Sequence, residues 1–391
     1  QRTALEGQRT ALESQRTALE GQRAALESQR TADQAAQLAY HWEAAGEPAR
    51  AIPYLLEMAR YAQASYANDE AITAFRHVLS LTVPDARRRR GGPDLAQIRR
   101  WRVAALRGLG KVLFATGKVA EAEAQFREAI ALARETGLPL PDLIRLYHWL
   151  GEALFWQGRT EERLALGLEG LALLDQEIPS VELALMNQMV AIGHMMRPAV
   201  DEYRDYTLRT AAFIGDLPYV PELQPAYEHV VGALVASKRT AEAVALLETL
   251  GRKVDLEQDL LAAAAIHRQW GELASALGDL EGALAAYEEV LALDARVGDV
   301  KHLAWALGDA ARFALELGDI TRAVALMTEL ERNATDSGNF RRIEYLLQGS
   351  VRRAMIDGQP ERGFGDAQRL LDHYRETGNA LAPAMGLILL G

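Results

Sequence analysis

The stretch Thr116-Gly117-Lys118-Val119-Ala120-Glu121-Ala122 decides the fold, because variants of it return along the chain. Each variant is a glycine-containing or polar turn with an acidic residue close by, and most end in a small residue; the others span 157–163, 237–243, 277–283, 317–323 and 357–363. The last residues of successive stretches are 41, 80, 40, 40 and 40 positions apart. The double interval predicts an irregular member near Tyr203. The spacing therefore indicates a repeat of about 40 residues.

Apolar residues at helical spacing flank each turn. Leu106, Leu109 and Leu113 precede the first turn, and Phe126 and Ile130 follow it. Spacings of three and four residues place each set on one face of a helix. The small residue after most turns allows the two antiparallel helices to approach closely. One such pair cannot bury both of its faces, so successive pairs must stack into a solenoid.

These residues resemble the tetratricopeptide (TPR) pattern, Trp-x2-Leu-Gly-x2-Tyr followed by Ala-x3-Phe-x2-Ala. The first unit fills the pattern with Leu106, Leu109-Gly110, Leu113, Ala122, Phe126 and Ala129. The resemblance implies an all-α, TPR-like α-solenoid of antiparallel helix pairs, wound as a right-handed superhelix. Two departures stand out. The units are longer than the 34 residues of the pattern, and the unit at 180–215 carries Met189, Met195 and Met196 where glycine and aromatic residues are expected.

The period and the composition divide the chain into five regions. Residues 1–32 repeat a seven-residue unit whose leucines recur without the second apolar position of a coiled coil, which leaves open a marginal helix, a disordered segment or an assembly tag. Helices near 34–45, 48–66 and 68–81 make 33–82 a three-helix opening of the solenoid. Residues 83–96 are an Arg/Gly/Pro-rich linker, 97–379 hold seven repeats, and 380–391 begin a further helix. The chain lacks an initial Met and ends on an apolar run, so we expect it to be part of a longer polypeptide.

A second resemblance lies in the three-helix opening. The stretch Leu38–Leu56, with Tyr66–Ile72, is similar to the start of the repeat region in large bacterial signalling proteins that join a cyclase or DNA-binding domain to a STAND-type ATPase. The resemblance implies a C-terminal sensing or scaffolding region whose ATPase or cyclase lies upstream on the same polypeptide.

Composition restricts the possible functions. The absence of cysteine excludes disulfides, thiol catalysis and cysteine-ligated metals, and fits a cytoplasmic protein. A net charge of −11 argues against binding to nucleic acid or a membrane surface. The run Arg87–Arg90 is the exception; it is either a solvated loop or a basic docking site for an acidic partner.

The search for catalytic motifs predicts no enzyme and no cofactor. Gly117-Lys118 lacks the other residues of a phosphate-binding loop. His148 and Glu152 lie one helical turn apart but no second histidine follows at metal-ligand spacing, so they are interpreted as lining the inner surface or pairing there. His194-Met195-Met196 is interpreted as gap-filling core.

In the TPR fold the first helix of each pair lines the concave surface, so the resemblance also selects candidate partner-binding residues. They are Arg107, Lys111, Arg145, His148, Glu152, Phe155, Arg268, Glu272, Trp305, Arg312, Tyr345, Gln348 and Arg352. Basic residues outnumber acidic ones in this set, and arginine with aromatic residues is typical of interface hot spots. The set therefore predicts a groove for an acidic peptide or a partner domain; the alternative is that these are simply hydrated inward-facing positions.

Three functions follow as hypotheses. The leading one is a protein-interaction and sensing module within a larger signalling ATPase or cyclase. A free-standing scaffold that holds two proteins together is the second. The third is a small-molecule sensor with a pocket at the irregular repeat 180–215.

Overall fold

The computed structural model describes residues 30–31, 33–83, 94–195, 200–297, 300–333 and 340–376. These residues fall into two compact units, one ending at Val112 and the other beginning at Leu113. Most of the tandem repeat 1–32, the run Arg87–Arg90 and the helix expected at 380–391 lie outside the described residues. The side chains of Met196 and Tyr345 lie outside them too.

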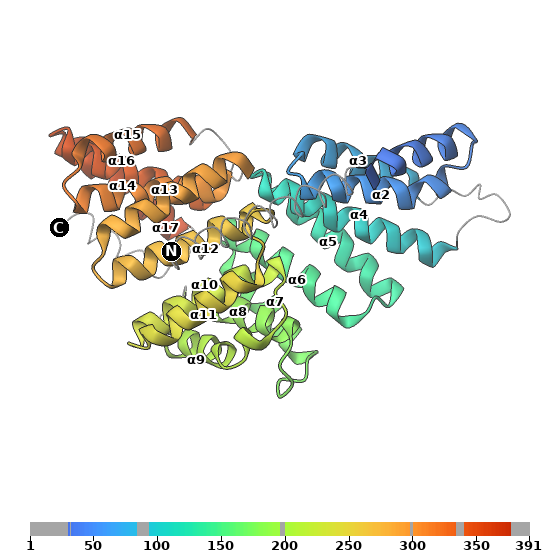
Figure 1. Ribbon diagram of the computed structural model, residues 1–391, viewed down its shortest axis with the longest axis horizontal. Coiled ribbons are helices and arrows are strands. Elements are labelled where there is room, and N and C mark those ends of the chain that lie inside the picture. The colour runs from blue at the N-terminus through green and yellow to red at the C-terminus, as the bar shows by residue number, and fades with distance from the viewer. Residues whose placement is uncertain are drawn as a thin grey trace, which may run out of the picture. The chain divides into compact units, whose positions relative to one another are not determined.

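Unit 1 contains a helix over 33–44, then α2 (Pro48–Ala64), α3 (Asn68–Leu81) and most of α4 (Leu95–Ala115). Helices α2 and α3 pack side by side (Figure 1). Gly108 on α4 permits a close approach of α3, because a Cβ atom there would lie 2.2 Å from the ring of Phe75. Phe75 is itself buried.

Unit 2 consists of α5 (Val119–Thr136) followed by helix pairs. The pairs are α6/α7 (Leu140–Trp156, Thr160–Ala172), α8/α9 (Val181–Met195, Val200–Ala211), α10/α11 (Gln224–Ala236, Thr240–Lys253), α12/α13 (Leu260–Ala276, Leu280–Val297), α14/α15 (Val300–Glu316, Ile320–Asn333) and α16/α17 (Phe340–Ile356, Pro360–Glu376). Two short 3₁₀ turns, η1 (Ile214–Asp216) and η2 (Pro221–Leu223), lie between α9 and α10. Within the described residues the chain forms no strand, so the all-α prediction is confirmed.

The recurring seven-residue stretch forms the joint of each pair. Its second residue adopts a left-handed conformation, with φ of 81° at Gly117 and 75° at Gly158. Only glycine takes this conformation without a steric penalty, which explains its place in the motif. Lys238 holds the same position in α10/α11 with φ of 59°. Its side chain therefore costs backbone strain there.

The residue that ends the stretch sets how closely the two helices of a pair pack. Ala122, Ala243, Ala283 and Ala323 have no exposed surface. The exception is Arg163, which occupies this position in α6/α7 and is also 0% exposed. A guanidinium group is therefore buried where α10/α11, α12/α13 and α14/α15 bury a methyl group.

The irregular repeat is the pair α8/α9, and α8 is buried almost all round. A Cβ atom on Gly170 would lie 2.3 Å from the sulfur of Met186, and one on Gly151 would lie 2.0 Å from the sulfur of Met189. Both methionines are completely buried. They fill the space left by glycines on α6 and α7, so packing explains these two methionines.

Candidate functional site

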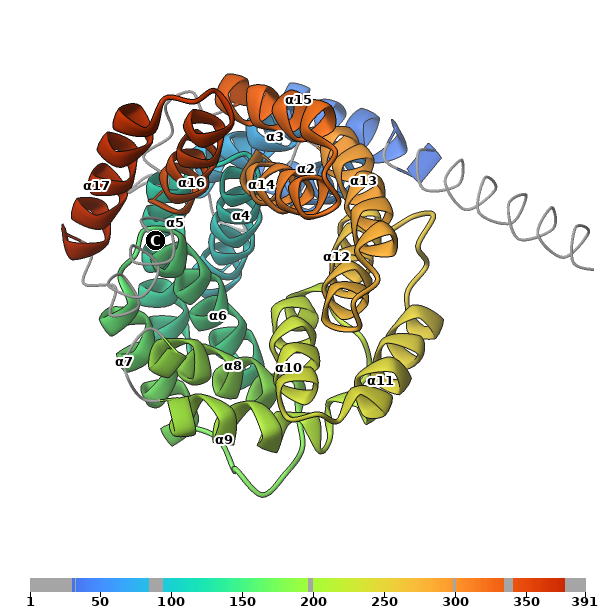
Figure 2. The same ribbon diagram turned by 90° about the vertical axis from the view of Figure 1, so that its left-hand side faces the viewer.

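The first helices of unit 2 form an inner face built from two packed runs, α6 to α12 and α14 to α16. Helix α6 packs on α8, α8 on α10, α10 on α12, and α14 on α16, whereas in the described part of the chain the second helices make no comparable contacts with one another. The stack therefore curves toward its first helices. Figure 2 shows α10 and α12 on the inner side of the curve and α9, α11 and α13 on the outer side. We call the surface of α6, α8, α10, α12, α14 and α16 the inner face.

The structure places most of the predicted partner-binding residues on these helices. On α6 are Arg145, His148, Glu152 and Phe155, on α12 Arg268 and Glu272, on α14 Trp305 and Arg312, and on α16 Gln348 and Arg352. Arg107 and Lys111 are half-buried on α4 and belong to unit 1. Tyr345 lies on α16, but its side chain is outside the described ones.

A column of polar residues at 40-residue intervals, interrupted at Gly308, runs along the inner face. Its members are His148, Gln188, Glu228, Arg268 and Gln348. The sequence prediction missed Gln188 and Glu228, because it did not extend the register through the units at 180–215 and 224–253. The spacing alone would have identified both.

Arg163 on α7 joins two helices of the inner face, α6 and α8. Its Nη2 donates to the Glu152 carboxylate at 2.8 Å and to the Gln188 amide oxygen at 3.2 Å. The guanidinium carbon lies 4.9 Å from the centre of the Phe155 ring. The sequence prediction missed Arg163 because its position in the motif normally faces the partner helix. The pairing of Glu152 with this buried cation accounts for a carboxylate on the inner face.

His229 on α10 lies close to this cluster. Burial, reinforced by the positive charge of Arg163, lowers the pKa of His229 to about 4, although the Glu152 carboxylate opposes the shift. The Tyr203 hydroxyl lies 3.4 Å from the His229 Nδ1 atom. His229 is therefore neutral at pH 7. Within the described residues there is no group of three His, Asp or Glu side chains placed to hold a metal ion.

Arg268 is the centre of a second cluster. Its Nη2 donates to Glu228 at 3.0 Å, and its guanidinium carbon lies 5.3 Å from the Trp305 ring centre. Burial alone would lower the pKa of Arg268, but the carboxylates of Glu228 and Asp294 outweigh it and raise the pKa. Arg268 is therefore charged and holds an aromatic ring of the neighbouring pair.

A third cluster joins α14 to α16. Arg312 donates to Asp309 at 3.3 Å and to Glu316 at 3.3 Å. Burial and the nearby Glu272 raise the pKa of Asp309 to about 6, against the opposing charge of Arg312. Burial also lowers the pKa of Arg352. No carboxylate among the described side chains lies within ion-pair distance of Arg352.

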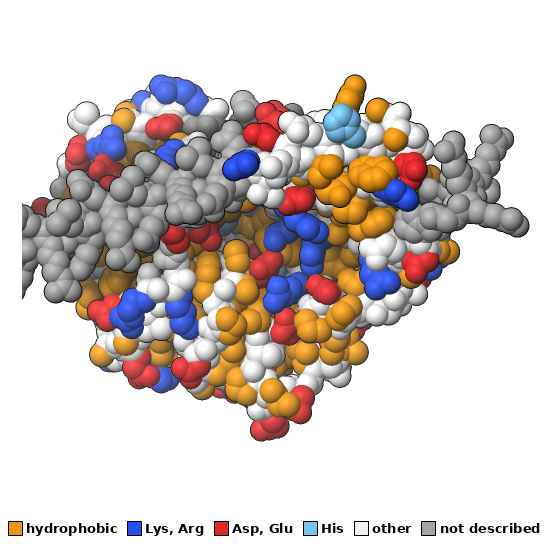
Figure 3. All heavy atoms as spheres, turned by 45° about the vertical axis from the view of Figure 1, so that its right-hand side comes forward, with side chains coloured by type: hydrophobic (Ala, Val, Ile, Leu, Met, Phe, Trp, Pro, Cys, Tyr) orange, Lys and Arg blue, Asp and Glu red, His pale blue; other side chains and the backbone are white. Residues whose placement is uncertain are grey.

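These ion pairs change the expected charge of the inner face. Arg145 pairs with Glu182 at 3.3 Å, and Arg163, Arg268 and Arg312 each have a carboxylate partner. The excess of basic residues read from the sequence is therefore largely offset. On the face of the molecule drawn in Figure 3, several Lys and Arg side chains gather near the centre, with acidic and hydrophobic side chains beside them.

An aromatic contact crosses the inner face. The rings of Trp156, at the end of α6, and His302, at the start of α14, have centroids 5.5 Å apart in an edge-to-face arrangement. The His302 ring in turn lies 6.1 Å from that of Trp305. Helices α8, α10 and α12 separate α6 from α14 along the stack, so this contact joins helix pairs that are not neighbours.

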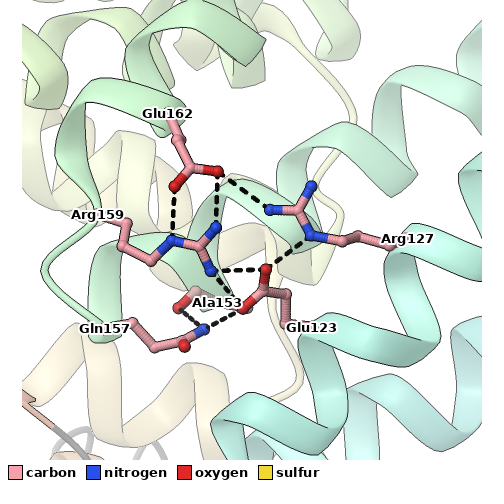
Figure 4. A network of polar contacts seen from close by, with 6 residues as sticks. All are labelled: Glu123, Arg127, Ala153, Gln157, Arg159 and Glu162. Carbon is pink, nitrogen blue, oxygen red and sulfur yellow. Dashed lines mark hydrogen bonds and ion pairs between the residues drawn. The ribbon is translucent and has the colours of Figure 1, made fainter.

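The joint between α5, α6 and α7 carries a further polar network (Figure 4). Arg159 donates to both Glu123 oxygens, at 2.7 and 2.8 Å, and to both Glu162 oxygens. Burial would raise the pKa of Glu123, but hydrogen bonds from Arg127, Gln157 and Arg159 hold it below its ordinary value. The network ties the turn of one pair to the second helix of the previous one. It is a structural brace at the joint.

Sequence comparison identifies no relative: no family model matches the chain, and no curated protein matches it. Among solved structures, the Rap protein complexed with competence and sporulation factor is similar over 87% of this chain and 96% of its own, with a TM-score of 0.52 and 13% identity. A STAND protein with a tetratricopeptide repeat sensor from Pyrococcus horikoshii matches over 83% of this chain and 42% of its own, with a TM-score of 0.41 and 12% identity. The apo quorum sensor NprR from B. thuringiensis matches over 94% and 100%, with a TM-score of 0.37 and 10% identity.

The likeness to Rap, at this low identity, concerns the fold. It agrees with the recurring turns and with the stacked helix pairs of unit 2. The predicted architecture is thereby confirmed: the chain is a TPR-like α-solenoid.

Proposed function

We propose that the inner face of unit 2 binds a segment of a partner protein and that the chain acts as an interaction module, not as an enzyme. The observation that carries the proposal is a pair of half-buried aromatic rings on the inner helices, Phe155 and Trp305, each packed against a buried arginine, Arg163 and Arg268 respectively. Such residues supply most of the binding energy at protein interfaces. Rap, which shares the fold, is complexed with competence and sporulation factor in its structure, so this architecture is able to hold a partner.

Arg312 and Arg352 are the proposed contact for acidic groups of the partner segment. Arg312 is half-buried and shares its charge with Asp309 and Glu316. Arg352 has no ion-pair partner among the described side chains, and a desolvated guanidinium is stabilised by an incoming carboxylate. An acidic residue of the partner would therefore be recognised by Arg312 and Arg352. Elsewhere on the inner face, where basic side chains are paired with acidic ones, no net charge of the partner would be preferred.

A peptide library displayed on phage and selected on the wild-type chain tests the proposal. We expect selected peptides to lose at least 100-fold in affinity, by calorimetry, on the variant R312E/R352E with its helical circular dichroism intact. The matched control is R322E/R332E, which makes the same change in charge on the outer helix α15. Equal loss in both variants, or no enriched peptide on the wild-type chain, would contradict the proposal.

The same module is proposed to be a sensing or scaffolding region of a larger cytoplasmic signalling protein of bacterial type. The support is the similarity of Leu38–Leu56 and Tyr66–Ile72 to the opening of such regions. The full-length reading frame tests this: a nucleotide-binding or cyclase domain upstream would support it, and an unrelated or absent upstream domain would favour a free-standing scaffold.

A further inference from the structure

We infer that Asp309 makes the junction of α12, α14 and α16 responsive to protons. The folded protein takes up one proton there under mildly acidic conditions, and this uptake strengthens the binding of an acidic group by Arg312 and Arg352. The first part concerns the helix stack alone. The second part rests on the proposed function and describes its regulation.

The junction of α12 with α14 differs from the other junctions of the inner face. In the described part of unit 2, each inner helix packs on the next, except that α12 reaches α14 mainly through α13. On the inner side the two helices are instead bridged by side chains, since the guanidinium carbon of Arg268 lies 5.3 Å from the Trp305 ring centre. Polar groups therefore meet at a place where helix packing does not determine the spacing.

Three carboxylates and two guanidinium groups gather at this junction. They are Glu272 of α12, Asp309, Arg312 and Glu316 of α14, and Arg352 of α16. Arg312 donates to Asp309 and to Glu316, at 3.3 Å in each case. The charges of Asp309, Arg312 and Glu316 all act on Arg352. Three negative and two positive charges leave one excess negative charge when all five groups are ionised.

Asp309 is the carboxylate that takes up the proton. Its side chain is only 19% exposed. Burial, together with the charge of Glu272, raises the pKa of Asp309 from 3.8 to about 6, although Arg312 and the Trp305 side chain oppose the shift. Between these two pH values the folded chain therefore holds a proton at Asp309 that the unfolded chain does not. Through this group, stability rises as the pH falls through 6.

Other polar groups also face the junction. The Tyr287 hydroxyl of α13 donates to Glu272 at 2.7 Å. Burial, with the charges of Asp309 and Glu272, raises the pKa of Tyr287 well above its ordinary value, so the hydroxyl stays protonated. Arg268 of α12 lies beside Asp294 of α13 and stays charged. The charged side chains of α15 are all exposed. The response near pH 6 is therefore assigned to Asp309.

Proton uptake by Asp309 changes what faces Arg352. Burial lowers the pKa of Arg352, and the carboxylates of Asp309 and Glu316 oppose this effect. Once Asp309 is neutral, Arg352 loses one of these two carboxylates, and Arg312 loses one of its two ion-pair partners. A carboxylate of the partner then meets the same two cations with less competition. Binding and proton uptake consequently favour each other.

Urea unfolding of the chain without a partner tests the first part. We would compare wild type with D309N between pH 7.5 and pH 5, and use D205N, at an exposed aspartate of α9, as the matched control. The unfolding equilibrium constant of wild type relative to D309N should fall about tenfold over this range, because only the folded wild type gains the proton. D205N should stay parallel to wild type. Parallel curves for D309N and wild type would overturn the inference.

The variant E272Q separates a junction from a buried carboxyl group acting alone. It removes the negative charge of α12 that opposes ionisation of Asp309, so the response should move to lower pH. A response in E272Q at the same pH as in wild type would overturn the role of the junction.

Calorimetry tests the second part. The probe is a histidine-free peptide that is selected on the wild-type chain and loses affinity on R312E/R352E. Titrations at pH 6.5 in two buffers of different ionisation enthalpy should show proton uptake on binding to wild type and none on binding to D309N. Affinity for wild type should be at least threefold higher at pH 5.5 than at pH 7.5. Equal uptake by both proteins would overturn the second part. If no peptide is enriched, the second part fails with the proposed function, and the unfolding measurements still decide the first.

Discussion

At the scale of single residues, one departure from the repeat motif sets the polar contacts between α6, α7 and α8. Arg163 replaces the small residue that other pairs use for close helix packing, and its side chain is fully buried against Glu152 and Gln188. Burying an ion pair gives little net stability, but removing one partner leaves a charge without compensation. This asymmetry makes the pair testable.

Arg163→Met should lower the free energy of unfolding by about 3–5 kcal/mol, because it leaves the Glu152 carboxylate buried without its cation. The double variant R163M/E152L should recover most of that loss, since two apolar side chains of similar volume then fill the site. Denaturant unfolding followed by circular dichroism measures both. In the control R239M, the pair with Glu242 is solvent-exposed, and stability should change little. A double variant no better than R163M would contradict the interpretation.

His229 makes the folded state sensitive to acid. Its pKa is about 4 in the folded protein against an ordinary 6.5, so between these values only the unfolded chain takes up the proton. Stability is therefore lost as the pH falls from 6.5 to 4, by up to roughly 3 kcal/mol. His229→Gln should remove this part of the acid sensitivity, so the melting temperature of the variant relative to wild type should rise from pH 7.5 to pH 4.5. An equal rise in the control His41→Gln, which makes the same substitution at an exposed histidine, would contradict the assignment to His229.

At the scale of helices, the space around each glycine shows whether a side chain could be accommodated there without disturbing the neighbouring helix. A Cβ atom at Gly193 on α8 would lie 2.8 Å from the Leu164 Cβ atom, which the backbone of α7 holds in place. The obstacle at Gly170 is the sulfur of Met186, the mobile part of a flexible side chain. A Cβ atom at Gly232 on α10 would meet nothing within 4 Å.

Alanine at these three positions should therefore have three different effects on stability. Gly193→Ala should destabilise by about 1–3 kcal/mol through overpacking. Gly170→Ala should be close to neutral, because Met186 can move and alanine favours the helix. Gly232→Ala should stabilise by about 0.5–1 kcal/mol through helix propensity alone. Thermal unfolding of the three variants checks the order, and a Gly193→Ala variant as stable as wild type would contradict the packing.

The elements were more predictable than the contacts between them. The turn motif and the 40-residue period predicted the paired helices, because glycine in the left-handed conformation and apolar faces are local properties. The inner positions of Arg268 and Trp305 followed from the register. The pairing of Arg163 did not, because its motif position predicts a small residue. The contact between Trp156 and His302 could not be predicted either, since it depends on the curvature summed over several pairs.

At the scale of the molecule, a destabilising substitution in one helix pair should affect the neighbouring pairs more than the distant ones. In a solenoid each pair is stabilised mainly by its neighbours. Tyr287 on α13 is completely buried, lies 5.4 Å from the Phe313 ring and donates a hydrogen bond to Glu272 at 2.7 Å. A change at Tyr287 should therefore be felt first in α12, α13, α14 and α15.

Tyr287→Ala should cost about 3–5 kcal/mol. Hydrogen exchange measured by mass spectrometry should accelerate in α12–α15, while α2 and α3 of unit 1 keep their protection. The end of α6 should also exchange faster, because His302 loses its support and no longer covers Trp156. A uniform acceleration along the whole chain would show a single cooperative unit and contradict this distribution.

The contact of Trp156 with His302 also bears on how this protein can change over evolutionary time. Open solenoids lengthen and shorten by duplicating or deleting whole modules, since every junction is alike. Here a module gained or lost between α6 and α14 would carry the two rings out of reach of each other. The number of modules in that interval is therefore held constant by geometry, whereas modules beyond α14 are free to vary.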